Sequence, residues 1–253
     1  MSASERLRVE CVTKSFGEVT AVNKLSIHLR AGEVLGLVGP NGAGKTTLFD
    51  LISGVCALDS GSIHLYGCDT AGLPPYRIAQ LGIGRMFQEL RLIRQITVLE
   101  NVMLSFPHQI GERLTSVALR WGSVRNMEKR NRCHAEKILS EVGLLDKRDS
   151  EAKALSYGQQ KLLSIACLQA TSAGLLLMDE PIAGITPEMV RTILLTINNL
   201  SVKGTAIMLI DHDLNAVSSV CRRIVFLDAG RMAAEGTPEE IRSNPDVIKA
   251  YLE

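Results

Sequence analysis

Residues 39–46 carry the pattern GxxxxGK[ST], in which glycines precede a lysine and a hydroxyl residue. Glycine permits backbone conformations closed to residues with a Cβ atom, so successive amides can converge on phosphate oxygens. The lysine then supplies a positive charge, and the threonine a hydroxyl for Mg²⁺. The pattern therefore predicts a site for a nucleoside triphosphate. The residues assigned to it are Gly39, Pro40, Asn41, Gly42, Ala43, Gly44, Lys45, Thr46 and Thr47.

The segments on either side of this pattern have the structure that it requires. An apolar run at residues 33–38 is typical of a strand, and residues 47–52 are typical of a helix. A helix N-terminus carries a partial positive charge that favours phosphate. Kinases, GTPases, helicases and transport ATPases all use such a loop, so the choice among them depends on later segments.

Two carboxylates follow a continuous apolar run at residues 175–178. A buried parallel strand would deliver Asp179 and Glu180 to the carboxyl edge of its sheet. Asp179 is then placed to hold the magnesium shell. Glu180 points elsewhere and can polarise the water that attacks the γ-phosphate.

A helix start is predicted at residues 155–159, ahead of an apolar stretch at 162–168. Ser156 can cap this helix, which would expose the helix's first amides to an anion.

In this order the motifs resemble those of the nucleotide-binding domains of ABC transporters, over nearly the whole chain. Residues 39–46 resemble Walker A, residues 155–159 the LSGGQ signature and residues 175–180 Walker B with its catalytic glutamate. Three single residues resemble further family positions: Gln88 of the Q-loop, the switch histidine His212, and Phe16, which would stack on adenine.

The resemblance implies ATP and Mg²⁺ as cofactors and assigns a role to each site residue. Catalytic roles are implied for Glu180, His212, Lys45 and Gln88. Nucleotide contacts are implied for Phe16, for the phosphate loop, and for Ser156, Gly158 and Gln159. Magnesium ligands are implied at Thr46, Gln88 and Asp179.

Two positions depart from the family pattern. Tyr157 stands where the signature usually has glycine, and the resulting LSYGQ resembles ATP-binding subunits of importers for branched-chain and other hydrophobic amino acids. Thr186 stands where the D-loop of the family usually has Asp or Asn. The contact that this D-loop residue makes with the second subunit of the family's dimer is therefore not expected to be the same here. Thr186 and Pro187 nevertheless form a good helix start, with threonine as N-cap.

Strand patterns predict an α/β fold with two kinds of sheet. Residues 7–11, 25–29 and 63–66 alternate apolar with polar, as in an antiparallel sheet with one wet face. Apolar runs at 34–38, 175–178 and 206–210 belong to a parallel sheet covered by helices such as 188–200, with a short strand and small helices after Arg231.

The predicted fold class is a P-loop NTPase of ABC type: a mostly parallel core sheet, an antiparallel β-subdomain and a helical subdomain. We expect residues 1–253 to form a single ABC ATPase domain. Its antiparallel flank covers about 5–32 and 60–70, its helical subdomain about 90–170, and the P-loop core the remainder.

Composition is that of a cytoplasmic enzyme. The chain has 253 residues, of which 46% are hydrophobic, and a net charge of +1. It has no apolar run of about 18 residues and no signal-peptide pattern at its start, so membrane contact is expected through a partner. Six cysteines without a CxxC pair predict reduced, buried thiols.

The segment 85–132 is strongly basic, with nine Arg and Lys against four Glu, a net charge of +5. Leu114, Val117, Ala118 and Trp121 have the spacing of one helix face. This surface could pack within a helical subdomain, or it could face a membrane subunit and the anionic inner leaflet. No basic strand with interleaved aromatic residues accompanies the charge, so no nucleic-acid partner is expected.

These features predict an ATPase that drives import of a small solute. Branched-chain or hydrophobic amino acids are the solutes that the features favour most. The expected partners are transmembrane permease subunits, a second identical or different ATP-binding subunit and, through the permease, an extracytoplasmic solute-binding protein. The enzyme would lie on the inner face of the cell membrane. Alternatives are transport of urea, amides or other solutes, a soluble ABC protein that remodels a macromolecular complex, and a scaffold that binds ATP without hydrolysing it.

Overall fold

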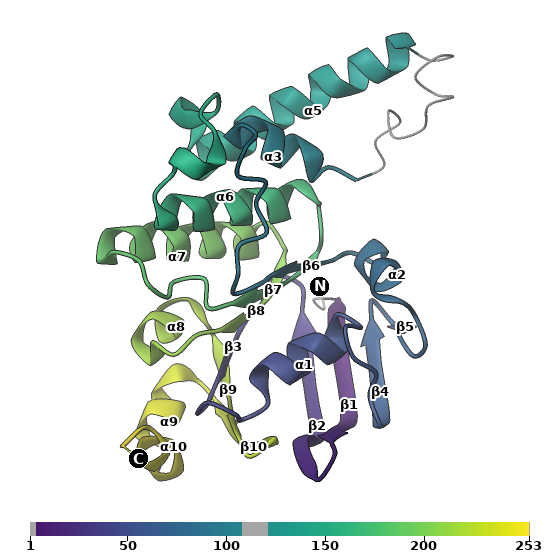
Figure 1. Cartoon of the computed structure of the whole chain (residues 1–253). Helices are drawn as coiled ribbons and strands as arrows, with labels where there is room; N and C mark the ends of the chain where they lie inside the picture. Colours follow the sequence, from purple (N-terminus) through teal and green to yellow (C-terminus); the bar gives the residue numbers. More distant parts are fainter. Residues whose placement is uncertain (1–3, 108–120, 253) are drawn as a thin grey trace. The chain divides into compact units, whose positions relative to one another are not determined.

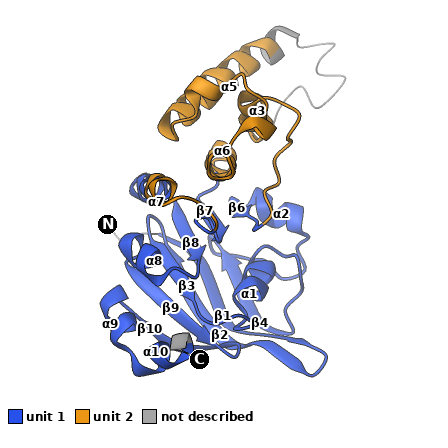
Figure 2. Cartoon of the chain, turned by 60° about the vertical axis from the view of Figure 1, so that its left-hand side comes forward, with its two compact units in different colours: residues 1–88, 173–183, 193–253 blue, residues 89–172, 184–192 orange. Residues whose placement is uncertain are grey.

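The structure, a computed structural model, describes residues 4–107 and 121–252 and divides into two compact units (Figure 2). Unit 1 comprises Met1–Gln88, Ala173–Ala183 and Ile193–Glu253, and unit 2 comprises Glu89–Ser172 and Gly184–Thr192. The assignment of the whole chain to a single domain stays a prediction.

Unit 1 contains an antiparallel sheet with strand order β2-β1-β4-β5. Its strands are β1 (Glu5–Phe16), β2 (Val19–Arg30), β4 (Ser60–Leu65) and β5 (Cys68–Asp69). Burial alternates along β2 from Leu25 to Arg30, because one face of this sheet packs on the core. The predicted antiparallel flank is confirmed.

A second sheet of unit 1 has six strands in the order β10-β9-β3-β8-β7-β6 (Figure 1). They are β3 (Val34–Val38), β6 (Ile83–Met86), β7 (Leu175–Asp179), β8 (Ala206–Ile210), β9 (Arg223–Asp228) and β10 (Arg231–Gly236). Pairing is parallel except between β9 and β10. Every residue of β3, β7 and β8 is buried, which explains their continuous apolar sequences.

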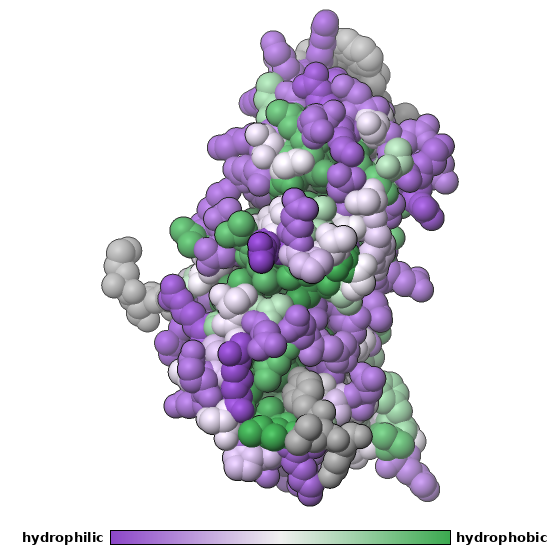
Figure 3. Space-filling model, turned by 90° about the vertical axis from the view of Figure 1, so that its left-hand side faces the viewer, coloured by the Kyte–Doolittle hydropathy of each residue, from purple (hydrophilic) through white to green (hydrophobic). Residues whose placement is uncertain are grey.

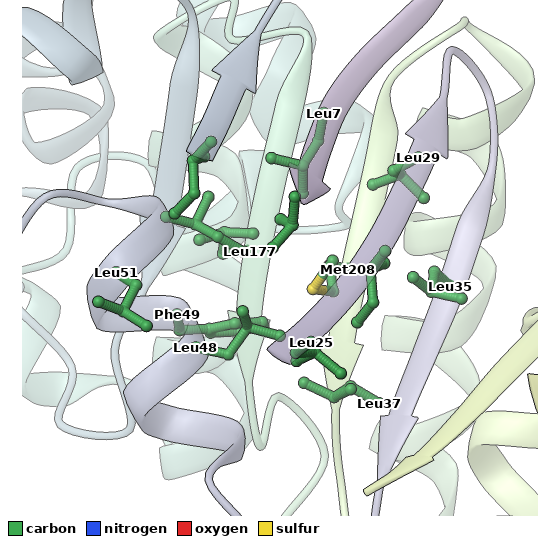
Figure 4. Packing of buried hydrophobic residues seen from close by; sticks show 14 of the residues in the cluster. Leu7, Leu25, Leu29, Leu35, Leu37, Leu48, Phe49, Leu51, Leu177 and Met208 are labelled. Atoms are coloured by element: carbon green, nitrogen blue, oxygen red, sulfur yellow. The ribbon is translucent and has the colours of Figure 1, made fainter. Parts of the chain in front are cut away.

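The helices of unit 1 are short. They are α1 (Lys45–Ile52), α2 (Pro75–Gln80), α8 (Leu214–Val220), α9 (Pro238–Ser243) and α10 (Pro245–Leu252). Leu48 and Phe49 of α1 belong to a hydrophobic cluster that includes Leu25 of the antiparallel sheet and Leu177 and Met208 of the six-stranded sheet (Figure 4). The helix that follows the phosphate loop is therefore fixed by both sheets.

Unit 2 is helical, with α3 (Val98–Leu104), α5 (Trp121–Glu141) and α6 (Tyr157–Ala170) in mutual contact. Two 3₁₀ turns, Leu145–Lys147 and Ala152–Ala154, connect α5 to α6. Helix α7 (Pro187–Val202) begins in unit 2 and continues into unit 1. The helical subdomain, part of the predicted fold class, is confirmed, whereas the apolar stripe at Leu114, Val117, Ala118 and Trp121 lies outside the residues whose side chains are described.

Surface features correct one expectation. On the face shown in Figure 3, hydrophilic residues cover most of the surface and apolar residues form separate patches.

All six cysteines are free, as predicted, but Cys11, Cys68 and Cys133 are exposed. The prediction that they are buried is wrong because Cys11 lies at a bulge of β1, Cys68 on a two-residue edge strand and Cys133 on the outer side of α5.

Candidate nucleotide site

The phosphate loop runs from the end of β3 to the start of α1 and is packed closely from two sides. A Cβ atom on Gly44, whose φ is +95°, would lie 2.1 Å from the carbonyl oxygen of Ala21 in β2. A Cβ atom on Gly39 would lie 2.1 Å from the carbonyl oxygen of Leu227 in β9. Glycine is therefore required at both positions for space as well as for conformation.

A backbone brace from the β9–β10 turn also holds the loop. The amide of Gly230 donates to the carbonyl of Ala43 (3.2 Å), and the carbonyl of Gly230 accepts from the amide of Asn23 in β2 (2.8 Å). This turn therefore links the phosphate loop to the antiparallel sheet.

Lys45 is turned back onto the loop. Its side chain is buried, and Nζ donates to the carbonyl oxygens of Gly39 (2.7 Å) and Pro40 (2.8 Å). Burial lowers the pKa of Lys45, and the charges of Glu180 and Asp179 partly offset this effect. The ammonium group is thus already positioned at the loop, and phosphate oxygens can replace the two carbonyl oxygens as its hydrogen-bond acceptors.

Strand β7 delivers its two carboxylates into different surroundings. Asp179 is 6% exposed, and burial followed by the nearby charge of Glu180 raises its pKa. Glu180 has φ +49°, a conformation that L residues rarely adopt, and its amide donates to the carbonyl of Ile210 (2.8 Å). The two neighbouring carboxylates therefore differ in backbone conformation and burial, and their division of tasks stays a prediction.

Two residues from separate motifs contact Glu180. Gln88 donates its Nε2 to Oε2 of Glu180 at 3.2 Å, and His212 Nε2 lies 2.8 Å from Oε1. Gln88 follows β6, and His212 follows β8, on either side of β7 in the sheet. Parallel strands place their carboxyl ends at one edge, which is why positions 88, 180 and 212 come together.

These residues border a pocket of about 310 Å³ in unit 1. Its lining includes residues 41–47 of the loop together with Gln88, Asp179, Glu180 and His212. Ala21 and Ile210, which sequence patterns did not single out, complete it. Phe16 lies outside the lining, at the end of β1, where its side chain is exposed and Lys14 Nζ lies 5.4 Å from its ring centroid.

The signature residues lie in unit 2, at the start of α6. Ser156 Oγ accepts from the amide of Gln159 (3.4 Å), and Gln159 Oε1 accepts from the amide of Ser156 (3.1 Å). This capping box confirms the predicted helix start and engages the side chain of Gln159. Gly158 is packed against Met189, whose Cγ would lie 2.5 Å from an added Cβ. Thr186 likewise caps α7, since its Oγ1 accepts from the amide of Met189 (3.4 Å).

The donor set of the pocket fits magnesium. Thr46 offers an exposed hydroxyl, Asp179 a carboxylate and Gln88 an amide oxygen, and Mg²⁺ prefers such oxygen ligands. In the part of the chain that the structure describes, no group of three His, Cys, Asp or Glu gathers to hold a metal.

Two structural residues of the site were missed from the sequence. Asp211 is buried and accepts hydrogen bonds from the amides of His212 (2.8 Å), Asp213 (3.2 Å) and Ile182 (3.4 Å). Its position directly after the apolar strand β8, comparable with that of Asp179 at the end of the apolar run of β7, was the available signal. Arg85 had been counted with the basic surface segment, but its side chain is only 7% exposed and pairs with Asp50.

Comparison with known proteins decides the family. The model of the family described as "ABC transporter" matches residues 22–183, which is more than half of the chain. The chain belongs to this family. A second model, described as "Branched-chain amino acid ATP-binding cassette transporter", matches residues 231–252.

Individual relatives match over almost the full length. The high-affinity branched-chain amino acid transport ATP-binding protein LivG of Salmonella typhimurium is 39% identical over 97% of both chains. BraF of Pseudomonas aeruginosa, which bears the same description, is 36% identical over the same shares. A crystal structure of an ATP-binding cassette of an ABC transporter in its ADP conformation superimposes with a TM-score of 0.83 at 32% identity, covering 98% of each chain.

These matches confirm the predicted fold class, the subfamily resemblance and the ATPase class, and ATP is the nucleotide of the family. The chain is thus the ATP-binding subunit of a membrane transport system. Within the described residues, none of the helices is both long and apolar enough to cross a bilayer.

Proposed function

We propose that this protein hydrolyses ATP to drive uptake of branched-chain or other hydrophobic amino acids through a separate permease. The proposal of hydrolysis is supported above all by the position of the Glu180 carboxylate, which contacts Gln88 and His212 in the lining of the phosphate pocket. The cargo follows from the family match at residues 231–252 and from the relatives named above.

The proposed mechanism uses the contacts at Glu180. Its carboxylate accepts a proton from the attacking water, and His212 and Gln88 fix its orientation. With Nε2 of Gln88 bound to Glu180, the amide oxygen is the group that would reach Mg²⁺, alongside Thr46 and Asp179. When bound, Mg²⁺ would neutralise charge on the phosphates.

The remaining nucleotide contacts follow the family assignments. Lys45 would exchange the carbonyls of Gly39 and Pro40 for phosphate oxygens. The amides of residues 41–47 would surround the phosphates. Phe16 would stack on adenine, and Ser156, Gly158 and Gln159 of a second ATP-binding subunit would close the γ-phosphate. A head-to-tail dimer, homo- or heteromeric, is therefore part of the proposal.

The proposed location is the inner face of the cell membrane, with an extracytoplasmic binding protein supplying solute to the permease. Helix α5 supports this placement. Its Arg125, Lys129, Arg130 and Lys137 are exposed, whereas Ala135, Ile138 and Leu139 of the same helix are buried. Exposed cations suit anionic headgroups, at about 1 kcal/mol for each cation near the surface.

The test is purification of the protein with its membrane partners from native membranes, followed by reconstitution in vesicles. ATP-dependent accumulation of radiolabelled leucine is expected, and Lys45→Ala should abolish it. Accumulation of urea or an amide in place of leucine would show that the assigned cargo is wrong. A wild-type complex that hydrolyses ATP without moving any of these solutes would contradict the assignment as their importer.

A further inference from the structure

Arg85 is a charged residue buried inside unit 1, in strand β6. Its side chain is 7% exposed, and arginine is rarely this buried unless it is paired. Gln88 follows only three residues later. The contacts of Arg85 therefore bear on the part of the chain that reaches Glu180.

One edge of the guanidinium binds helix α1. Nη1 of Arg85 lies 2.7 Å from Oδ1 of Asp50 and 2.8 Å from Oγ of Ser53. Asp50 belongs to the helix that begins at Lys45, directly after the phosphate loop. The bond to Asp50 is charge-assisted and partly buried, since the side chain of Arg85 is 7% exposed and that of Asp50 is 32% exposed.

The same guanidinium also lies over two aromatic rings. Its Cζ is 4.6 Å from the ring centroid of Phe87 and 5.8 Å from that of Phe49 in α1. Both distances are within the range of a cation–π contact. Phe87 precedes Gln88, whose amide is bonded to Glu180. A single side chain therefore contacts the helix of the phosphate loop and the residue next to Gln88.

We propose that Arg85 is a positioning residue that keeps α1 in register with Gln88. Gln88 would then be placed to contact both Mg²⁺ and Glu180 when nucleotide is bound at the phosphate loop. This inference rests on the proposed ATPase mechanism. Arginine suits the task better than lysine, because only a planar guanidinium can hydrogen-bond along its edge while stacking through its face.

The test compares Arg85→Lys with Arg77→Met as a matched control. Arg77 is an exposed arginine of α2 that lies 5.5 Å from the Tyr76 ring, so it shares the stacking but not the link to the loop. The measurements are Tm, affinity for ATP without Mg²⁺, kcat, KM and the Mg²⁺ concentration that half-saturates hydrolysis.

For Arg85→Lys we expect a folded protein whose Mg²⁺-free ATP affinity stays within about twofold of wild type. The kcat should fall about tenfold, and the half-saturating Mg²⁺ concentration should rise about tenfold, the scale of a misplaced positioning group. Asp50→Asn should shift both values in the same direction, by less, since asparagine still accepts a hydrogen bond. Arg77→Met should leave all of these values at wild-type levels.

Two results would overturn the proposal. One is Arg85→Lys with wild-type kcat and Mg²⁺ dependence. The other is a parallel loss of Tm, Mg²⁺-free binding and activity in both Arg85→Lys and Asp50→Asn, which would mean a purely structural role. An inactive wild-type protein would instead contradict the proposed ATPase mechanism, so the two failures are distinguishable.

Discussion

At the scale of residues, the two acids at the end of β7 differ in what surrounds them. Glu180 is bonded on both carboxylate oxygens, whereas Asp179 is buried with a raised pKa. Neighbouring carboxylates in unlike environments are how one site divides metal binding from proton transfer. Two predictions follow from this difference.

Glu180→Gln should leave ATP binding intact and slow hydrolysis by at least about 10²-fold, the usual effect of losing a positioned base. Lys45→Ala should instead weaken ATP binding. Phosphate release and equilibrium binding of a fluorescent ATP analogue separate the two effects. Equal hydrolysis by wild type and Glu180→Gln would remove Glu180 from the catalytic role.

Asp179→Asn should raise the Tm of the nucleotide-free protein near neutral pH while removing a magnesium ligand. Burial raises the pKa of Asp179, so its ionised form disfavours folding. This cost is absent well below the unfolded pKa of about 3.9, grows as pH rises from the unfolded pKa to the raised folded pKa, and stays constant above it.

Thermal melts from pH 4 to 8 check this sign. The gain in Tm of Asp179→Asn should increase with pH, while the exposed Asp146→Asn serves as the control. A variant that melts below wild type at neutral pH would show that Asp179 stabilises the empty site.

At the scale of elements, the phosphate loop is shaped by the strands against which it packs. Gly42→Ala meets no atom within 4 Å, so only its φ of +80° opposes the change, at about 1–2 kcal/mol. Gly44→Ala would also collide with the carbonyl of Ala21, so it should cost more and displace β2. Urea denaturation of both variants measures the difference, and equal midpoints would contradict the packing argument.

The segment after β6 is the expected docking element for the permease. Arg91 and Arg94 are exposed, as is Ile93 between them, close in sequence to Gln88. Arg91→Glu with Arg94→Glu should leave basal ATPase near wild type yet abolish co-purification with the permease and solute uptake. Arg77→Glu with Arg242→Glu changes the charge equally and should leave uptake intact. Normal uptake by the first pair would exclude this docking site.

Sequence patterns predicted the elements well because their causes are local. Continuous apolar runs predicted the strands β3, β7 and β8, and capping residues predicted where the helices α6 and α7 begin. The motif residues Gln88, Glu180 and His212 meet because each follows one of three adjacent parallel strands.

Contacts between distant residues could not be predicted in this way. Arg85 counts as one surface charge in the sequence, yet its partner Asp50 lies 35 positions away. The engagement of Lys45 with two loop carbonyls depends on the folded path of the loop. The hydrogen bond from the amide of Ile182 to Asp211 joins residues 29 positions apart and depends on the course of the chain after β7.

At the scale of the whole molecule, the lining of the nucleotide pocket comes from unit 1 and the signature from unit 2. The proposed second subunit would bring a signature to this pocket. Glu180→Gln, unable to discharge its ATP, should become dimeric when ATP is added. Light scattering at saturating ATP and micromolar protein checks this expectation. A monomer under those conditions would count against the head-to-tail dimer, and Lys45→Ala should stay monomeric as the control.

Because the amide of Gly230 donates to the carbonyl of Ala43, we expect the β9–β10 hairpin to influence ATP turnover through the phosphate loop. Amino-acid changes after β9 that shift its hairpin alter the loop's shape without touching any motif. For the same reason, a fusion partner or a proteolytic nick near Arg231 would distort kinetic measurements, whereas the exposed loop before α2 offers a safer attachment point.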